Sequence, residues 1–549
     1  MRKIIALLLI CTLLMTSFSA CGFLGLDLAP NLPQQDDPPT DEGATPRDAY
    51  IPRDGRLSIA YWPTDSLNPY TTTTRDNLAV SGLLYESLFV LEEDFTASNE
   101  LAVGLTTLDG RNYTIEILQG VTFHNGNALT ARDVVYSLNR ARNSDLFQSR
   151  LNIISGYSFV EHPDGSVNPY LLELTLNRVH GNLPVLLTFP IIQDGSSAWR
   201  VPPGTGPFRY PEDGTDRLLY HSAHRDEEHL PVRTIYLEDI QTMEQMTAYF
   251  NSGLLDIVYL DLQGPDPQFS ATREQRQLNT STLDFIGFNI HRPHTGRLEV
   301  RQAIQFAIDR DYITNNILRG HAIPTPLPMH PVLSFYDTEL SLAHRFDLTH
   351  AREILHGLPD EIDDEEAPSE PEPSDEPDDY GDGDDESARE PESPNPQLRL
   401  IVAQGSVARI EAAVYVAANI SALGFQVVVE DLPPNEFLAA LENGNFDLFY
   451  GQVRLQPDFD LWELIGGTLA FGGMDLLINP LFVENFIAAG QSGRADAATN
   501  LNRAILHAVP FVSIGFRYEY LFTQRGVVSN LNPSQERVYR DVFSWILDL

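Results

Sequence analysis

The stretch YTIEILQGVTFHNGNALTARDVVYSL, residues 113–138, constrains the fold of this chain more than any other. Its first five residues alternate between apolar and polar side chains, the period of a half-buried β-strand, and residues 121–123 predict a short second strand. His124-Asn125-Gly126 predicts a tight turn, because Asn-Gly readily takes positive φ. Thr130 stands three residues before Asp133, close to a helix-capping box, and apolar residues at helical spacing follow. The stretch therefore predicts two strands, a turn and a capped helix, with no catalytic arrangement.

The length and charge of the chain restrict the number of domains and the kinds of function that it can have. A chain of 549 residues is too long for one hydrophobic core and predicts two or three domains. It has 77 acidic and 36 basic residues, and a surface of that sign argues against nucleic-acid binding. Lys3 is the only lysine, so Schiff-base chemistry is excluded from the rest of the chain.

The N-terminus has the pattern of a targeting segment. A basic start precedes an apolar run over residues 4–15, which is short for a membrane span. The sequence Phe-Ser-Ala-Cys that ends at Cys21 resembles a bacterial lipobox, which predicts a lipoprotein signal peptide at 1–20 and lipidation of Cys21. Cys11 leaves with such a signal, so Cys21 has no disulfide partner. The alternative is an ordinary secretory signal that is cleaved nearby.

Two further segments have compositions that disfavour folding. Residues 21–55 are rich in Pro, Asp, Gln and Thr, and predict a disordered tether. From 360 to 396 acidic residues dominate and apolar ones are nearly absent, which predicts a disordered surface insertion. Within it, residues 378–389 fit a calcium-binding EF-hand loop poorly, because Tyr380 stands at a ligand position and Arg389 replaces the bidentate Glu.

The rest of the chain alternates between strand and helix patterns. Strands are predicted at 57–61, 171–176, 284–289 and 510–516, and a helix at 300–310. Between residues 398 and 450 the order is strand, helix, strand, helix, strand. This order at this spacing predicts a lobe with a parallel sheet, and the chain as a whole is of the α/β class.

Several of these segments resemble one protein family. The pattern Gly-Val-x-Phe-His-x-Gly, followed by Thr-Ala-x-Asp-Val-x-x-Ser, is similar to the signature of family 5 solute-binding proteins, the extracytoplasmic receptors of oligopeptide, dipeptide and nickel ABC importers. Its positions here are Gly120, Val121, Phe123, His124, Gly126, Thr130, Ala131, Asp133, Val134 and Ser137. DSLNP at 65–69, GTGPF at 204–208 and VRQAIQFAIDR at 300–310 resemble the family as well. The resemblance runs from Arg56 to the end, apart from the acidic insertion.

The resemblance implies a two-lobed periplasmic-binding-protein type II fold with an extra subdomain, the three-domain arrangement of cluster C, and two crossing strands as a hinge. Lobe I would comprise residues 56–280, with the smaller subdomain at about 85–200. Lobe II would comprise residues 281–508 and carry the acidic insertion, and residues 509–549 would return to lobe I. Ligand would be enclosed as the lobes close about the hinge.

Catalytic and metal-binding patterns have little support. The sequence contains no Gly-x-Ser-x-Gly elbow and no His-Glu-x-x-His, so we expect a binding protein without cofactor rather than an enzyme. His221, His224 and His229 cluster loosely beside Glu227 and Glu228. A metal site is one interpretation of this cluster, and a solvated polar loop is the favoured one.

Candidate ligand-binding residues come from positions where the family lines its cleft. They are Tyr61, Trp62, Phe288, Asn289, Tyr450, Gln452, Arg454, Arg517 and Tyr518. Peptide-binding members carry an Asp shortly after a Gly-Trp in this region, and it pairs with the α-ammonium of the peptide. Here Gln452 replaces the Trp, and the Asp position holds Val453, Arg454 or Leu455. An Arg in the cleft would favour a carboxylate or another anion.

The sequence therefore predicts a substrate-binding lipoprotein of an ABC importer, which captures a peptide or peptide-like solute and delivers it to the permease. It would be monomeric, anchored by its N-terminal lipid at the extracytoplasmic face of the bacterial cell membrane, and partnered by permease and ATPase subunits. One alternative is a sensor or adhesion lipoprotein on the same fold. Another is a binder of a non-peptide anion or a metal chelate. A secreted hydrolase is disfavoured because the catalytic patterns are missing.

Overall fold

The computed structural model describes residues 56–262, 267–356 and 396–547. The predicted signal peptide, the lipidation site Cys21, the tether and the acidic insertion up to residue 395 lie outside these ranges. Within the ranges, no helix is long and apolar enough to cross a membrane.

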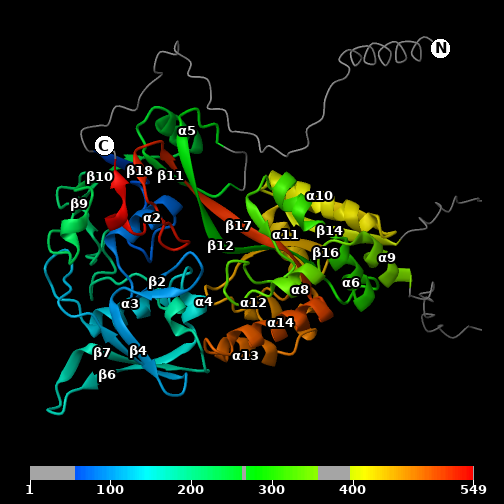
Figure 1. The fold of residues 1–549 in the computed structure, drawn as a ribbon, viewed down its shortest axis with the longest axis horizontal. Helices are drawn as coiled ribbons and strands as arrows, with labels where there is room; N and C mark the ends of the chain where they lie inside the picture. Colours follow the sequence, from blue (N-terminus) through cyan, green and yellow to red (C-terminus); the bar gives the residue numbers. More distant parts are fainter. Residues whose placement is uncertain (1–55, 263–266, 357–395, 548–549) are drawn as a thin grey trace, which may run out of the picture. The chain divides into compact units, whose positions relative to one another are not determined.

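A mixed sheet of 11 strands runs through the described residues (Figure 1). Its order is β15 (Gln426–Leu432), β14 (Gln397–Ala403), β16 (Leu448–Arg454), β12 (Arg273–Phe288), β17 (Phe511–Gln524), β11 (Ile257–Leu260), β1 (Leu57–Tyr61), β10 (Thr234–Asp239), β9 (Arg217–Tyr220) and β8 (Phe208–Arg209). The short β13 (Ala322–Pro324) pairs with β17 off this path. We call β1 and β8 to β11 with their helices lobe I, and β14 to β16 with theirs lobe II.

The two longest strands, β12 and β17, join the lobes. They are antiparallel to each other, and their pairing extends from Arg273 opposite Gln524 to Gly287 opposite Phe511. The second half of β12 also pairs with β16 of lobe II, and the second half of β17 pairs with β11 of lobe I. Each strand therefore leaves one lobe and enters the other, which confirms the predicted pair of crossing strands. The predicted boundary at residues 280 and 281 falls within β12.

Lobe II contains the parallel unit that the sequence predicts. Strands β14, β15 and β16 are parallel, and helices α10 (Val407–Ser421) and α11 (Pro434–Glu442) connect them. Gly424 follows α10 with φ +100°, a conformation that favours glycine. The helix predicted at 300–310 is wrong at its end: α6 spans Leu298–Ala307 and Ile308 is extended. Asp309 instead caps a new turn, because its side chain accepts a hydrogen bond from the backbone N–H of Tyr312.

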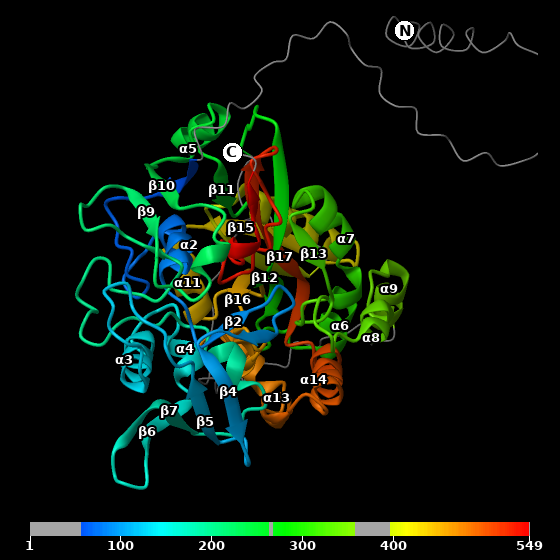
Figure 2. The same ribbon diagram turned by 60° about the vertical axis from the view of Figure 1, so that its left-hand side comes forward.

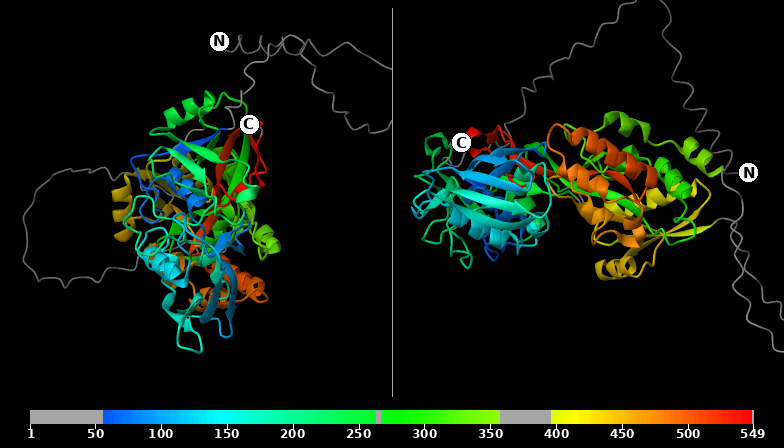
Figure 3. Two further views of the ribbon diagram at one scale, coloured as in Figure 1. Left: turned by 90° about the vertical axis from the view of Figure 1, so that its left-hand side faces the viewer. Right: turned by 90° about the horizontal axis from the view of Figure 1, so that it is seen from below.

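A four-stranded antiparallel sheet lies next to lobe I (Figure 2). Its order is β4 (Ala102–Thr107), β5 (Asn112–Ile117), β7 (Val167–Leu176) and β6 (Ile154–Glu161), and it is preceded by the hairpin of β2 (Phe89–Leu91) and β3 (Ala97–Asn99). We call β2 to β7 with α3 (Ala131–Ala141), α4 (Gln148–Leu151) and the loop from β7 to the short helix Leu183–Leu186 the subdomain. In the right-hand view of Figure 3, this blue and cyan part of the chain lies on the opposite side from the yellow and orange residues of lobe II.

The subdomain contains the stretch 113–138. The capping box of α3 is confirmed, with both hydrogen bonds between Thr130 and Asp133 in place. Gly126 has φ +85°, as the predicted turn requires. The short second strand predicted at 121–123 is wrong: only an isolated bridge between Thr122 and Ala128 forms, because the turn closes on these residues.

The remaining helices belong mainly to lobe II. They are α2 (Arg75–Leu84) and α5 (Met243–Asn251) in lobe I, and α7 (Arg310–Tyr312), α8 (Thr338–Ala343), α9 (Leu348–His356), α12 (Trp462–Ile465), α13 (Leu481–Ala488) and α14 (Arg494–Ala508) in lobe II. Near the end of the described residues, β18 (Val528–Ser529) and β19 (Ile546–Leu547) form a short antiparallel pair.

Candidate ligand site between the lobes

The carboxyl ends of the parallel strands of the two lobes meet at the crossing strands. Arg454, the last residue of β16, lies opposite Thr282 of β12. Leu260, the last residue of β11, lies opposite Tyr520 of β17. Because β12 and β17 are paired through this same region, the two strand ends face one part of the hinge. In open α/β sheets ligands bind outside the carboxyl ends of the strands, so this junction is the candidate site.

On the lobe II side, the buried carboxylate of Asp284 organises the polar side chains. It accepts hydrogen bonds from the hydroxyl of Tyr450 at 3.1 Å and from Nε2 of Gln452 at 2.8 Å. The guanidinium of Arg517 lies 3.9 Å away, and Arg409 donates to Oε1 of Gln452 at 3.1 Å. Burial, and then the charge of Asp284, raise the pKa of Tyr450 well above its ordinary value, so the hydroxyl stays a donor. Three of the predicted residues thus converge on a carboxylate that was not predicted to belong to the site.

Arg454 lies at the end of β16 with its side chain exposed. Burial, and then the charge of Glu519, raise the pKa of the Tyr259 hydroxyl in β11 well above its ordinary value, and the charge of Arg454 acts on this phenol from the other lobe in the opposite direction. Tyr259 donates a hydrogen bond to Glu519 of β17. Arg75 forms an ion pair with Asp261 at 3.0 Å and approaches Glu519 within 3.8 Å. Charged side chains of lobe I and of β17, together with Arg454 of lobe II, therefore lie at the junction.

Sequence reasoning missed Glu519 and Asp261. Asp261 directly follows the last residue of a buried strand, and Glu519 directly follows Tyr518, which was predicted to bind ligand. Their positions beside these residues could have indicated both carboxylates from the sequence. Tyr518 itself is half-buried, and its backbone N–H donates to the carbonyl of His321 at 3.0 Å.

The predicted residues of lobe I are held by local contacts. Tyr61 is fully buried, and its hydroxyl accepts a hydrogen bond from Arg200 at 2.6 Å. Trp62 is half-buried, and its indole N–H donates to Asp76 at 2.8 Å. Asn77 accepts from the backbone N–H of Trp62 at 2.8 Å. The structure thus leaves part of the Trp62 ring accessible and encloses that of Tyr61.

Phe288 and Asn289 lie in the interior of lobe II. Phe288 is fully buried in the hydrophobic core of this lobe. The amide of Asn289 donates to the carbonyls of Gly444 at 2.9 Å and Phe446 at 3.1 Å. In this arrangement both side chains secure the end of β12, and they do not join the polar group at Asp284.

A pocket of about 360 Å³ lies between the subdomain and lobe II. Its lining residues are Ser149, Arg150, Asn152, Ile153, Asn177, Arg178, His180 and Leu186 from the subdomain, and Gln456, Asp458, Asp460, Trp462 and Glu463 from lobe II. None of the residues predicted to bind ligand lines it, although Gln456 comes only two residues after Arg454. Two polar pairs connect its walls: His180 with Asp458 at 2.9 Å and Arg178 with Asp460 at 2.6 Å.

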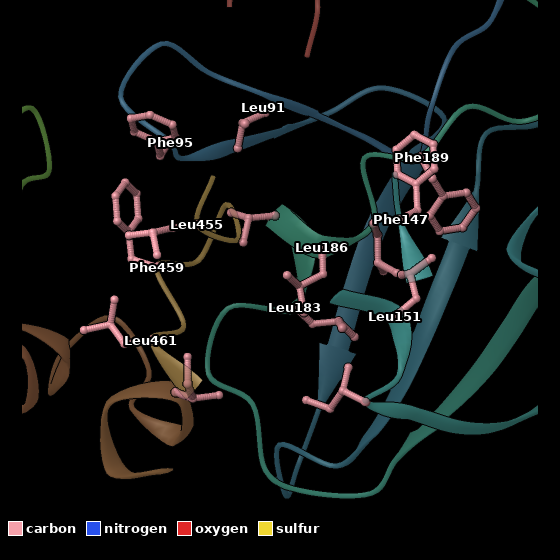
Figure 4. Packing of buried hydrophobic residues seen from close by; sticks show 14 of the residues in the cluster. Leu91, Phe95, Phe147, Leu151, Leu183, Leu186, Phe189, Leu455, Phe459 and Leu461 are labelled. Carbon is pink, nitrogen blue, oxygen red and sulfur yellow. The ribbon is translucent and has the colours of Figure 1, made fainter. Parts of the chain in front are cut away.

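Apolar contacts connect the same two parts of the chain (Figure 4). Phe95, in the turn between β2 and β3, packs edge-on against Phe459 with ring centroids 5.0 Å apart. It also contacts the ring of His330 at 5.4 Å. In Figure 4, Leu455 of lobe II lies on the side facing Leu186 of the subdomain. The subdomain and lobe II therefore share one continuous core in this structure.

Two of the clustered histidines, His221 and His224, are held by hydrogen bonds. His224 donates to Glu86 with Nε2 and Oε1 3.4 Å apart, because its Nδ1 accepts from the N–H of Asp226. Next to His221, burial lowers the pKa of His124 to about 3. His229 is exposed. Nowhere in the described part of the chain do three or more His, Cys, Asp or Glu side chains lie in a position to hold a metal ion.

The chain resembles known proteins in sequence. The family model described as "Bacterial extracellular solute-binding proteins, family 5 Middle" matches residues 97–461. The glutathione-binding protein GsiB of Salmonella paratyphi A is 24% identical over 317 residues, which are 54% of this chain and 60% of the relative. The oligopeptide-binding protein AppA of Bacillus subtilis is 23% identical over 296 residues, 50% of this chain and 53% of the relative. These relatives are binding proteins rather than enzymes, as the sequence predicts for this chain.

Solved structures show the same fold. The ABC-transporter substrate-binding protein CtaP of Listeria monocytogenes superposes with a TM-score of 0.69 at 17% identity, covering 90% of this chain and 99% of that one. A peptide-binding protein AppA from Clostridium difficile superposes with a TM-score of 0.67 at 15% identity, covering 90% and 100%. The predicted two-lobed fold class is therefore confirmed.

Proposed function

The chain belongs to the family 5 bacterial extracellular solute-binding proteins, and on this premise we propose that it is the substrate-binding lipoprotein of an ABC importer. It captures a peptide or peptide-like solute outside the membrane, and closure of the two lobes delivers the solute to the permease. The observation that carries this proposal is the meeting of both sets of strand ends at β12 and β17, with charged side chains of both lobes around the junction.

The side chains at the junction favour a ligand with a carboxylate. Of the three residues at the position where peptide-binding relatives carry an Asp, Leu455 is buried in the shared core and Val453 is half-buried. Arg454 alone is charged and exposed. A guanidinium there attracts a carboxylate and repels a free α-ammonium. This supports a peptide bound through its acidic groups, and it keeps a non-peptide anion or a metal chelate as the second candidate.

The remaining parts of the proposal rest on the sequence. Lipidation of Cys21 would anchor a monomer at the extracytoplasmic face of the cell membrane, and permease and ATPase subunits would be its partners. A sensor or adhesion lipoprotein would have the same fold and anchor but no permease. Loss of uptake of the identified solute when the gene is deleted would favour the importer, and unchanged uptake would favour the sensor.

The mass of whatever co-purifies with the protein tests the ligand class directly. We expect native mass spectrometry of the freshly purified protein to show a bound peptide-like species, released on denaturation. Adding that species back to stripped protein should reduce the radius of gyration in solution scattering, because lobe closure compacts the molecule. A bound metal chelate or non-peptide anion would exclude peptides, and turnover of the bound species would revive a hydrolase.

A further inference from the structure

The two crossing strands lose their regular pairing where β12 passes from one lobe to the other. Asn279 pairs with Tyr518, and the next pair along the strands is Leu283 with Phe516, so residues 280–282 stand opposite a single residue of β17. On one side of this bulge, β12 lies against the half of β17 that also pairs with β11 of lobe I. On the other side it pairs with β16 of lobe II. The bulge therefore marks the boundary between the lobes, and a strand bends at such a bulge.

Side-chain hydrogen bonds replace the ladder at the bulge. Ser281 is fully buried, and its backbone N–H donates to Oε1 of Gln535 at 2.5 Å. Its hydroxyl donates to the carbonyl of Leu455 at 2.7 Å, and its carbonyl accepts from the N–H of Leu455 at 2.9 Å. The hydroxyl of Thr280 donates to the carbonyl of Arg517 at 2.7 Å. Because buried backbone groups need partners, these contacts hold the bulge in one conformation.

Gln535 is itself firmly held. It is buried, in the segment between β18 and β19. The carboxylate of the next residue, Glu536, accepts a hydrogen bond from Arg150 of the subdomain at 2.5 Å. The guanidinium of Arg537 donates to the carbonyl of Gly82, in α2 of lobe I, at 3.2 Å. Gln535 therefore reaches the bulge from a segment that is fastened both to lobe I and to the subdomain.

Leu455 connects the bulge with the candidate ligand site. It directly follows Arg454, the last residue of β16, which pairs with Thr282 at the edge of the bulge. The side chain of Leu455 is buried in the core that the subdomain and lobe II share. Its backbone N–H and carbonyl are both bound to Ser281. The backbone at Arg454 is therefore placed by Ser281, and through Ser281 by Gln535.

We propose that Ser281 and Gln535 are positioning residues of the candidate ligand site, which hold the end of β16 and so place Arg454 at the junction of the lobes. The inference rests on the proposed function, because the place of Arg454 matters only if this junction takes up a solute. Neither side chain has to contact that solute. Lobe closure bends the crossing strands, and Ser281 keeps the end of β16 attached to β12 during this movement, while Gln535 relates its position to lobe I.

Hydrogen–deuterium exchange of the purified full-length protein tests the inference without a ligand. Gln535→Met keeps the length of the side chain and removes the acceptor, and Ser281→Ala removes the hydroxyl. We expect each variant to raise the exchange rate of the amides of residues 452–456 by about three- to tenfold, as the loss of one hydrogen bond predicts. The amides of β14, in the same lobe, should exchange as in the unchanged protein.

Two further variants serve as rescue and control. Gln535→Glu retains an acceptor oxygen for the N–H of Ser281 and should restore slow exchange. Gln275→Met makes the same replacement at an exposed position in the lobe I half of β12 and should leave exchange unchanged. If Ser281→Ala does not fold, Gln535→Met decides the question, because it nearly preserves the buried volume.

Nuclear magnetic resonance of the protein labelled with ¹⁵N-arginine measures the effect at Arg454 itself. Its backbone N–H signal is identified by its absence from Arg454→Ala. This signal should shift in Gln535→Met, whereas that of Arg503 on α14 should stay in place.

Two results would overturn the inference. One is unchanged exchange of residues 452–456 in Gln535→Met together with an unshifted Arg454 signal. The other is faster exchange spread evenly over both lobes, since it would show a general loss of stability. Solute capture would stand in either case, because neither measurement involves a solute. Conversely, unchanged uptake after gene deletion would contradict the importer and leave the contacts at Ser281 as measured.

Discussion

The imidazole of His180 donates a hydrogen bond to the carboxylate of Asp458, with Nε2 and Oδ2 2.9 Å apart and both side chains buried. The direction is set by Nδ1, which accepts from the backbone N–H of Asn182 at 3.1 Å. Burial by itself raises the pKa of Asp458, but the hydrogen bond from His180 and the nearby charges bring it below its ordinary value. This pair joins the loop after β7 to the segment after β16, and thus the subdomain to lobe II.

Removing the imidazole should loosen this junction. In His180→Ala, Asp458 stays buried without its main donor, and breaking one side of such a pair costs roughly 3 kcal/mol or more. We expect a lower thermal unfolding temperature and a larger radius of gyration of the ligand-free protein in solution scattering. His162→Ala, at an exposed turn between β6 and β7, is the matched control. If both variants unfold and scatter alike, His180 does not hold the junction.

A methyl group at Gly181 should separate the same two surfaces. The N–H of Gly181 donates to the carbonyl of Ile487 at 2.8 Å, and a Cβ at this position would overlap the carbonyl of Ala489. Gly181→Ala should therefore favour the open arrangement of subdomain and lobe II, with weaker ligand binding and a larger radius of gyration. Gly104→Ala, on β4, has open space around its new Cβ and should leave both quantities unchanged. If Gly181→Ala binds ligand normally and keeps the radius of gyration of the unchanged protein, the close contact at Gly181 does not hold the two surfaces together.

Acid should weaken the contact of His330 with Phe95. Burial lowers the pKa of His330 from 6.5 to about 4. The folded state thus binds this proton less readily than the unfolded state. The stability that the neutral ring provides is complete above pH 6.5, and it is lost as the pH falls from 6.5 towards 4.

Chemical denaturation across this pH range measures the effect. We expect the free energy of unfolding to fall less steeply with acid in His330→Gln than in the unchanged protein, whereas the exposed control His162→Gln should retain the original slope. The same slope in all three proteins would show that His330 does not contribute.

Arg454 should matter for affinity and not for folding. Its side chain is exposed, so Arg454→Ala should change the free energy of unfolding by less than about 0.5 kcal/mol. Loss of its charge should weaken binding of an identified carboxylate ligand by about tenfold, as measured by calorimetry. Arg503→Ala on α14 removes another exposed arginine away from the strand ends and should bind normally. Unchanged affinity in Arg454→Ala would remove it from the site.

Part of the candidate site follows from sequence patterns and part does not. Tyr450, Gln452 and Arg517 were expected at the ends of strands, and they do converge, on Asp284. The sequence shows Asp284 only as a polar residue at the start of an apolar strand, and this position does not predict that it belongs to the site. Phe288, expected in the cleft, packs in the core, because a strand position predicts alternation but not which face lies inward.

The sequence by itself determined the alternation of strands and helices between residues 398 and 450, the capping box of α3 and the membership of a family. These features depend on local backbone hydrogen bonding and on periodic burial, which neighbouring residues encode. Only the tertiary structure decided that Arg150 and His180 face Asp458 and Asp460 across one pocket. His180 and Asp458 are 278 positions apart, and their meeting depends on how β12 and β17 place the subdomain against lobe II. No local pattern specifies such a contact, since it is the packing of whole elements that brings the two walls together.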